Sequence, residues 1–308
     1  MKAIADLDLW QDASAFPRIH GECHRYEPMS LHTSFRIGGV ADYFTAASSV
    51  ADLQALLRWA QDEQMPVFII GAGTNILVSD AGIRGLVIHM GGNLAEIYIS
   101  GNHLIAGSAV RLQNLISSSL GCGLTGVESL YGIPGTVGGA VCMNAGTWAG
   151  GVQDTIESVT VIGEDTELYE IPSDQLKFRY RGSIIKDEGL TVVQAVFNLG
   201  RGSVDTARDV IEQLIEKRRK AQPSGKTAGS VFKNPDGDFA GRILESIGAK
   251  GLQIGGARVS MRHANFIENT GTASAEDIRN LVEMLIRMVY EQKGICLEPE
   301  IQMVGEWN

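Results

Sequence analysis

The sequence predicts an α+β fold from three observations: a capped helix near residue 50, an apolar run directly after it, and a strand-rich stretch that follows. Ser49-Val50-Ala51-Asp52 has the form of a capping box, and apolar residues then recur at helical spacing to about Gln64. Val67–Ile70 is a short apolar run typical of a strand, and it enters the first glycine cluster, so the chain starts as a βαβ unit. Further strands are expected at residues 85–90, 96–100 and 103–106.

Later elements keep the same mixed character. A helix is predicted over 110–120, with Gly121 and Gly123 as stop signals, and strands follow at 159–162 and 190–199. An amphipathic helix then begins near residue 204 and ends in a basic run at 217–220. Two more helices are expected, one over 240–247 and a longer one with its apolar face at Ile278, Leu281, Val282, Leu285 and Val289.

Length and charge restrict the classes of function. A chain of 308 residues is long for one hydrophobic core and predicts two domains, or three small ones. The formal net charge of −10 argues against a sequence-independent grip on nucleic acid or anionic lipid. The four cysteines are scattered without metal-ligand spacing, and there is no signal-like or membrane-spanning run. We expect reduced thiols, no metal, no nucleic acid or membrane partner, and a cytoplasmic location.

The first glycine loop is Gly71-Ala72-Gly73-Thr74-Asn75, which continues to Ser79 and Asp80. Its glycines and its small polar side chains offer the hydrogen-bond donors that a pyrophosphate needs. A Rossmann fingerprint is excluded, because the third glycine is missing and residues 80–85 break the chain before any long helix. A tight surface turn is the alternative interpretation.

The second glycine loop is Gly132-Ile133-Pro134-Gly135-Thr136-Val137-Gly138-Gly139. Four glycines with an internal proline make a preorganised loop, which can lay backbone amides against a flat or anionic ligand. With the first loop it suggests a split cradle for a phosphate-bearing cofactor. Close packing of two strands, or of a helix on a sheet, explains the glycines equally well.

Two shorter motifs lie in the last third of the chain. Residues 227–235 place a hydroxyl, a cation and an amide at Ser230, Lys233 and Asn234. Without a Gly-x-Ser-x-Gly elbow or an identifiable histidine base, Ser230 fits a hydroxyl donor better than a nucleophile, and a capping serine is the alternative. In Leu297-Glu298-Pro299-Glu300-Ile301, Glu300 is expected to open a short final strand, although an isolated glutamate there is usually solvated.

These motifs, in this order and at these spacings, resemble the UDP-N-acetylenolpyruvoylglucosamine reductases, the MurB family of flavoenzymes in bacterial cell-wall synthesis. The resemblance runs from about Leu31 to Gly305. It is carried by both glycine loops and by His32-Thr33-Ser34-Phe35-Arg36-Ile37-Gly38-Gly39, Tyr180-Arg181-Gly182-Ser183, residues 229–235, Gln253-Ile254-Gly255-Gly256-Ala257, His263-Ala264-Asn265-Phe266 and residues 297–301. Eight motifs in register make the resemblance highly specific.

The resemblance implies a two-lobed FAD-binding domain of the vanillyl-alcohol-oxidase (PCMH) type, followed by a smaller α+β substrate-binding domain. We expect an N-terminal extension at 1–30, the FAD domain at 31–202 with lobes at about 31–90 and 91–202, and the substrate domain at 203–308. The implied reaction is NADPH-dependent reduction of UDP-N-acetylglucosamine enolpyruvate to UDP-N-acetylmuramate through noncovalent FAD. We expect a monomer or a weak homodimer.

The resemblance also implies the roles of individual residues. Arg181 would hold the substrate carboxylate, Glu300 would help to polarise the intermediate, and Ser230 would deliver the proton to carbon. The substrate-binding positions would be Tyr180, Lys220, Asn234 and Gln253, with the local alignment around Lys220 ambiguous. The cofactor-binding positions would be Arg36, Gly71, Ala72, Gly73, Thr74, Asn75, Ser79, Gly132, Ile133, Pro134, Gly135, Thr136, Gly138 and Gly139.

One departure and two rival interpretations remain. Residues 184–202 are too few for the tyrosine-bearing insertion of the family's longer variant, so the chain resembles the compact variant. No residue is assigned to the role of that tyrosine, which closes over the substrate. A rival from the same fold is an oxidase or dehydrogenase with its flavin tethered to a histidine, for which His32 is the candidate. The other rival is a nucleotide-binding regulator without turnover.

Overall fold

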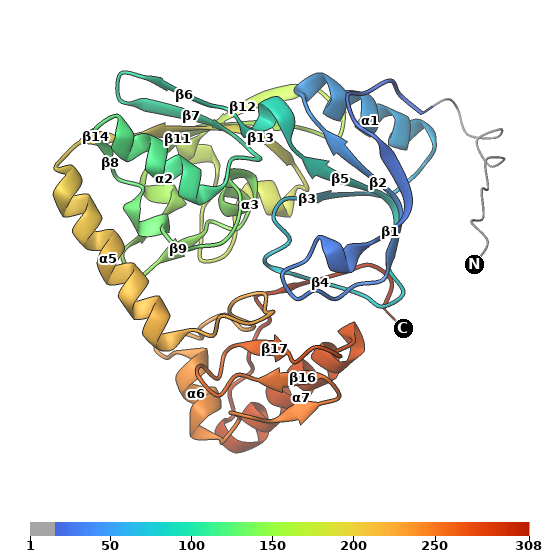
Figure 1. Cartoon of the computed structure of the whole chain (residues 1–308), viewed down its shortest axis with the longest axis vertical. Helices are drawn as coiled ribbons and strands as arrows, with labels where there is room; N and C mark the ends of the chain where they lie inside the picture. The colour runs from blue at the N-terminus through green and yellow to red at the C-terminus, as the bar shows by residue number, and fades with distance from the viewer. Residues whose placement is uncertain (1–15, 308) are drawn as a thin grey trace.

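The first lobe is a four-stranded sheet covered by one helix. A computed structural model describes residues 16–307 (Figure 1). Its first sheet has the strand order β1-β2-β5-β3, with β1 antiparallel to β2, and with β2 and β3 each parallel to β5. The elements are β1 (Cys23–Pro28), β2 (Val40–Ala47), α1 (Val50–Asp62), β3 (Val67–Ile70) and β5 (Ile83–Met90). α1 buries Leu53, Leu56 and Trp59 against this sheet, as its helical spacing predicts.

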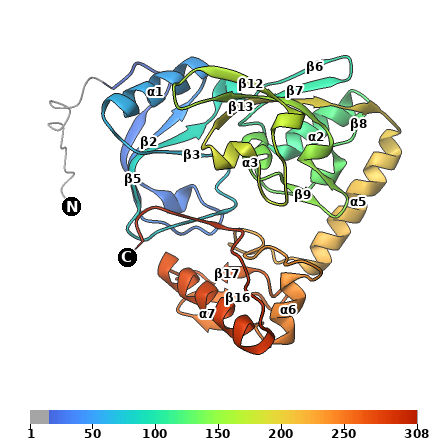
Figure 2. The same ribbon diagram turned by 180° about the vertical axis from the view of Figure 1, so that it is seen from behind.

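The second lobe is a five-stranded antiparallel sheet in the order β12-β11-β13-β7-β6. Its strands are β6 (Ile97–Ser100), β7 (His103–Gly107), β11 (Ile156–Ile162), β12 (Leu168–Pro172) and β13 (Thr191–Asn198). Its helices are α2 (Leu112–Gly121), α3 (Val137–Cys142) and α4 (Ile184–Asp187), and two small ribbons pair β8 (Leu124–Thr125) with β14 (Gly200–Arg201) and β9 (Gly146–Thr147) with β10 (Gly150–Gly151). Both views place α3 and β9 between the sheet and the C-terminal elements (Figures 1 and 2).

A long helix leads from the second lobe to the C-terminal elements. α5 (Val204–Ala221) runs along one side of the molecule, from the second lobe toward α6 (Figure 1). Beyond it, a three-stranded antiparallel sheet in the order β15-β16-β17 packs with two helices. These elements are α6 (Ala240–Ser246), β15 (Gln253–Ile254), β16 (Ala257–Val259), β17 (Ile267–Asn269) and α7 (Ala275–Lys293). The predicted apolar face of α7 is buried, and Gly294, at φ 69°, ends the helix in the left-handed conformation.

The C-terminal elements are joined to the first lobe. β18 (Gln302–Val304) returns to pair in parallel with β4 (Ile76–Val78), the strand that follows the first glycine loop. Phe35, Ile37 and Leu77 of the first lobe also belong to the core of the C-terminal elements. The segment that carries Glu300 is therefore fixed to the lobe that carries the glycine loop.

Two local expectations need correction. Ser49 caps α1 by accepting from the Asp52 N–H, but the Asp52 carboxylate accepts from Ser48 rather than from Ser49, so the reciprocal bond of the capping box is missing. The final strand begins at Gln302 and not at Glu300, because Pro299 and Glu300 are occupied with the Val231–Phe232 backbone. In addition, β1 pairs along β2, so Cys23–Pro28 is part of the first sheet.

Candidate active site

The centre of the candidate site is an ion pair between Arg181 and Glu300. Arg181 Nε lies 2.5 Å from Glu300 Oε1, and the two side chains are only 21% and 13% exposed. Arg181 comes from the turn before α4, whereas Glu300 comes from the segment before β18. The Arg181 backbone adopts φ 56°, a conformation that a non-glycine residue seldom takes and that recurs at functional sites. The guanidinium also lies over the Tyr180 ring, 5.1 Å from its centroid.

Burial shifts the pKa of the Glu300 carboxyl. Removal from water raises the pKa of the Glu300 carboxyl above its ordinary value, because the charged form loses hydration. Arg181 opposes that rise, and Lys233 and Lys186 oppose it more weakly. The direction that remains is upward, so the neutral acid is favoured more than in water. A carboxyl in this state can donate a hydrogen bond as well as accept one.

Ser230 lies in the segment that pairs with Glu300. The Glu300 N–H donates to the Val231 carbonyl at 2.7 Å, and the Lys233 N–H donates to the Glu298 carbonyl at 2.9 Å. On the other side, the Asn265 side chain accepts from the Phe232 N–H at 2.9 Å and donates to its carbonyl at 2.8 Å. Segment 230–233 is thus held in place along its backbone. Ser230 lines a cavity of about 340 Å³ together with Asn234, Phe239, Arg242 and His263.

The two glycine loops meet, as the split cradle requires. The Thr74 hydroxyl donates to the Pro134 carbonyl at 2.8 Å, which ties the first loop to the second. Gly71 faces Thr136 so closely that an added Cβ would lie 2.7 Å from the hydroxyl oxygen. Glycine at this position therefore permits the close approach of the two loops.

A second cavity adjoins the first loop and suits an anionic group. It has a volume of about 250 Å³, and its lining includes Gly71, Arg36, Arg111, His89 and Ser34. We call it the cationic cavity, after Arg36 and Arg111. No carboxylate is among its lining residues, although the chain as a whole carries a charge of −10. Within residues 16–307 the buried Ser34 hydroxyl finds no hydrogen-bond partner, so it is available to a ligand. The lining and the touching loops fit the phosphates of FAD.

The remaining predicted residues divide into those near the ion pair and those held elsewhere. The Asn234 N–H donates to the Tyr180 hydroxyl at 3.2 Å, so these two join the segments of Ser230 and Arg181. Lys220 is 70% exposed at the end of α5 and pairs with Glu216 at 2.8 Å. Gln253 is exposed and donates to the Gly255 carbonyl at 2.8 Å. Ser79 is buried and bonded to the C-terminal segment.

Some residues of the site were missed by sequence reasoning. Asn265 holds the Ser230 segment, and although its motif was noticed, no role was given to it. Arg218 donates to the Gly132 carbonyl at 2.6 Å and so supports the second loop, but in the sequence it is one cation of a basic helix end. His89 and Arg111 line the cationic cavity without belonging to any motif. A local pattern could have found only Asn265.

The lobes and the site define an FAD-dependent oxidoreductase. Residues 41–171 match the FAD binding domain family. The structure of 6-hydroxy-D-nicotine oxidase from Arthrobacter nicotinovorans superposes with a TM-score of 0.60 over 94% of this chain and 90% of that chain, and at 14% identity it shares the fold alone. The predicted fold class, a two-lobed FAD-binding domain with a further α+β domain, is thereby confirmed.

The chain belongs to the UDP-N-acetylenolpyruvoylglucosamine reductase family. Residues 219–304 match the family's C-terminal domain. The reductase of Caldanaerobacter subterraneus is 40% identical over 287 residues, covering 93% of this chain and 95% of the relative, and that of Desulforamulus reducens is 40% identical over 289 residues, covering 94% and 95%. The crystal structure of UDP-N-acetylenolpyruvylglucosamine reductase from Thermus caldophilus matches with a TM-score of 0.81 and 32% identity, over 93% of this chain and all of that chain.

Proposed function

We propose that this chain reduces UDP-N-acetylglucosamine enolpyruvate to UDP-N-acetylmuramate in peptidoglycan synthesis, with Arg181, Glu300 and Ser230 as its catalytic groups. The observation that carries the assignment of these groups is the Arg181–Glu300 contact beside the Ser230 segment. Segments from three distant parts of the chain meet there, through that ion pair and through the backbone pairing of residues 231–233 with residues 298–300. Bound FAD would supply the hydride, which it takes from NADPH.

Arg181 and Glu300 are suited to bind the substrate carboxylate and to stabilise the negative charge that develops there. The guanidinium is permanently charged and presents a planar set of donors that fits a carboxylate, here the enolpyruvyl carboxylate of the substrate. Negative charge gathers on that carboxylate and its neighbouring carbon when hydride adds to the methylene carbon. Glu300, with its raised pKa, can donate a hydrogen bond to the same charge. Partial burial makes both interactions stronger than they would be in water.

Ser230 is proposed as the donor of the proton that completes the reduction. Ser230 directly precedes Val231 and Phe232, whose backbone is bonded to Glu300 on one side and to Asn265 on the other, so the backbone next to the hydroxyl is fixed. It also lines the larger cavity, which has room for part of a sugar nucleotide. Tyr180 and Asn234 are proposed to contact the substrate, because they join the two segments that carry the catalytic groups. Gln253 and Lys220 are proposed as further contacts, and both are exposed.

The two touching glycine loops, with Arg36 in the cationic cavity, are proposed to hold FAD without a covalent bond. His32, the histidine considered for a tether, has Nε2 2.8 Å from Glu27 Oε1 and stacks on Phe44 at a centroid distance of 4.1 Å. Both contacts occupy the imidazole and support the noncovalent alternative. A cytoplasmic location, a monomer or weak homodimer, and domain boundaries near residues 90 and 202 also remain proposals.

The function is tested on the purified protein under anaerobic conditions. We expect a flavin absorption spectrum whose colour is released by denaturation, bleaching on addition of NADPH, and recovery on addition of UDP-N-acetylglucosamine enolpyruvate. Colour that stays with the denatured chain would indicate a tethered flavin. Binding of FAD without consumption of NADPH would indicate the regulator instead.

A further inference from the structure

Asn75 of the first glycine loop forms hydrogen bonds to the backbone on both sides of Ile301. The Asn75 side-chain amide donates to the Glu300 carbonyl at 3.2 Å, and the Gln302 N–H donates to the Asn75 carbonyl at 2.9 Å. Ile301 itself is 4% exposed. The residue after the catalytic carboxylate is therefore fixed by the loop that is proposed to hold FAD.

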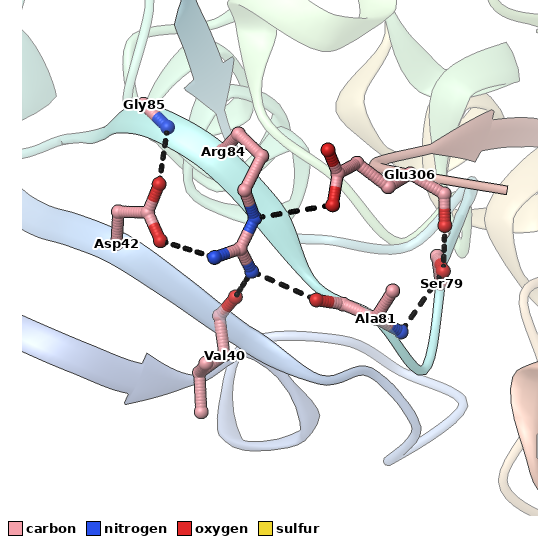
Figure 3. A network of polar contacts seen from close by, with 7 residues as sticks. All are labelled: Val40, Asp42, Ser79, Ala81, Arg84, Gly85 and Glu306. Carbon is pink, nitrogen blue, oxygen red and sulfur yellow. Dashed lines mark hydrogen bonds and ion pairs between the residues drawn. The ribbon is translucent and has the colours of Figure 1, made fainter.

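Ser79 makes a second connection, at the end of β18. Its N–H donates to the Val304 carbonyl at 2.9 Å, and its hydroxyl donates to the Glu306 carbonyl. The same hydroxyl oxygen accepts from the Ala81 N–H at 3.1 Å (Figure 3). Ser79 is 4% exposed, so its single hydroxyl proton is already used inside the protein. This arrangement disagrees with a role for Ser79 in binding a cofactor.

The partly exposed Arg84 side chain supports the same turn, at residues 79–81. Its guanidinium lies 2.5 Å from Asp42 Oδ1 and donates to the Ala81 carbonyl at 2.8 Å (Figure 3). Its Nε lies 3.5 Å from Glu306 Oε2. The Arg84 and Glu306 side chains are 40% and 60% exposed, so this ion pair contributes little by itself. Its effect is to hold the turn that presents Ser79.

We propose that residues 75–84 form a clamp that positions the Glu300 carboxyl, and that Ser79 is a positioning residue for the reduction and not a ligand of the cofactor. The inference rests on the proposed function, in which Glu300 acts with Arg181. Arg181 belongs to the second lobe, while the clamp belongs to the first, so the geometry of the pair depends on where the clamp holds segment 300–306. A loosened clamp displaces Glu300 and leaves the glycine loops in contact through Thr74.

The test is Ser79→Ala, compared with Ser119→Ala as a matched control. The Ser119 hydroxyl is also buried and donates to a carbonyl, that of Leu124 at 3.1 Å, but it lies in α2 of the second lobe. For Ser79→Ala we expect an unchanged dissociation constant for FAD and an unchanged rate of bleaching by NADPH. The limiting rate of recovery with saturating enolpyruvyl substrate should fall about tenfold, the scale of one hydrogen bond expressed in a positioned step. Ser119→Ala should leave that rate unchanged.

Each result decides the inference. A dissociation constant for FAD raised at least about fivefold in Ser79→Ala, the worth of one hydrogen bond, would make Ser79 a cofactor ligand and overturn it. Equal recovery rates in the two serine variants would also overturn it. If Ser79→Ala does not fold, Arg84→Gln on the exposed side of the clamp should slow recovery about threefold at unchanged FAD affinity, and an unchanged rate would overturn the inference. Wild-type protein that never recovers its colour refutes the proposed function instead.

Discussion

Glu300 and Arg181 are both largely buried, and each is the other's nearest opposite charge. A carboxyl and a guanidinium with little exposure lose much of their hydration, and the 2.5 Å contact compensates both. The raised pKa of Glu300 shows that the compensation is incomplete, because burial outweighs the nearby cations. In the proposed reaction the site also receives the carboxylate of the substrate, and a carboxyl whose pKa is raised can meet that charge as a hydrogen-bond donor.

Replacement of Arg181 by lysine tests its planar geometry separately from its charge. We expect Arg181→Lys to slow recovery of the flavin colour by enolpyruvyl substrate at least about tenfold, because a point charge cannot present two parallel donors to a carboxylate. Arg179→Lys is the control, since Arg179 is a neighbouring exposed arginine paired with Asp187 at 2.5 Å. Stopped-flow absorbance measures both. Near-wild-type recovery in Arg181→Lys would mean that another group holds the carboxylate.

Removal of the Ser230 hydroxyl tests the proton donor. We expect Ser230→Ala to leave bleaching by NADPH near normal and to slow recovery with enolpyruvyl substrate at least roughly a hundredfold, the usual effect of losing a general acid. Ser246→Ala is a control, because the Ser246 hydroxyl donates within α6, to the Ile243 carbonyl at 2.7 Å. The two half-reactions are followed separately under anaerobic conditions. Equal damage to both would remove Ser230 from this role.

At the scale of elements, the start of α7 is capped across two parts of the molecule. Ser274 and Asp277 form a capping box within the helix, while the Asp80 carboxylate of the first lobe accepts from the Ala275 and Glu276 N–H groups at 2.9 and 3.0 Å. A carboxylate there meets both the free donors and the positive end of the helix dipole. The first lobe thus holds the C-terminal elements through this cap as well as through β18.

The cap that Asp80 provides to α7 predicts that removal of its carboxylate lowers the stability of the protein. Asp80→Ala should lower the free energy of unfolding by about 1 kcal/mol, the usual worth of a helix cap. Asp62→Ala is the control, because Asp62 is an exposed aspartate at the end of α1, where it caps no N-terminus. Thermal unfolding at a fixed concentration of FAD measures both. Asp80→Ala with the melting temperature of Asp62→Ala would show that the capping box suffices alone.

The sequence predicted the helices and strands well where the pattern was local. The apolar face of α7 follows from periodicity, because burial of one face determines the spacing of apolar residues, and the strand Val67–Ile70 follows from a short apolar run. Glu300 shows the opposite case. Its neighbours predicted a strand and a solvated carboxylate, but the actual partners are Val231 and Arg181, which are distant in sequence. Only the resemblance to a family, and not any pattern around residue 300, indicated that these groups meet.

At the scale of the whole molecule, the contact between the glycine loops joins the two lobes. Gly71 and Thr74 belong to the first lobe, and Pro134 and Thr136 belong to the second. A ligand held by both loops binds the assembled protein and not the separated lobes, so its binding energy becomes stability of the assembly. The hydrogen bonds of Ser79 and Asp80 connect the first lobe to the C-terminal elements, so stabilisation of the assembled lobes extends to these elements as well.

This coupling predicts how stability depends on FAD. At a free FAD concentration about one hundred times its dissociation constant, the holoprotein should be more stable than the stripped protein by about 2.7 kcal/mol, by mass action alone.

Thr74→Val removes the hydrogen bond between the loops and should raise the dissociation constant for FAD about fivefold, the worth of one hydrogen bond. Thr125→Val is the control, because the Thr125 hydroxyl donates to the Gly200 carbonyl, at 3.4 Å, within the second lobe. Flavin fluorescence measures affinity, and thermal unfolding with and without FAD measures the coupling. Because the lost bond supports cofactor binding, Thr74→Val should lower the melting temperature more with FAD than without it, and an equal loss in both states would show that Thr74 does not link the cofactor to the assembly of the lobes.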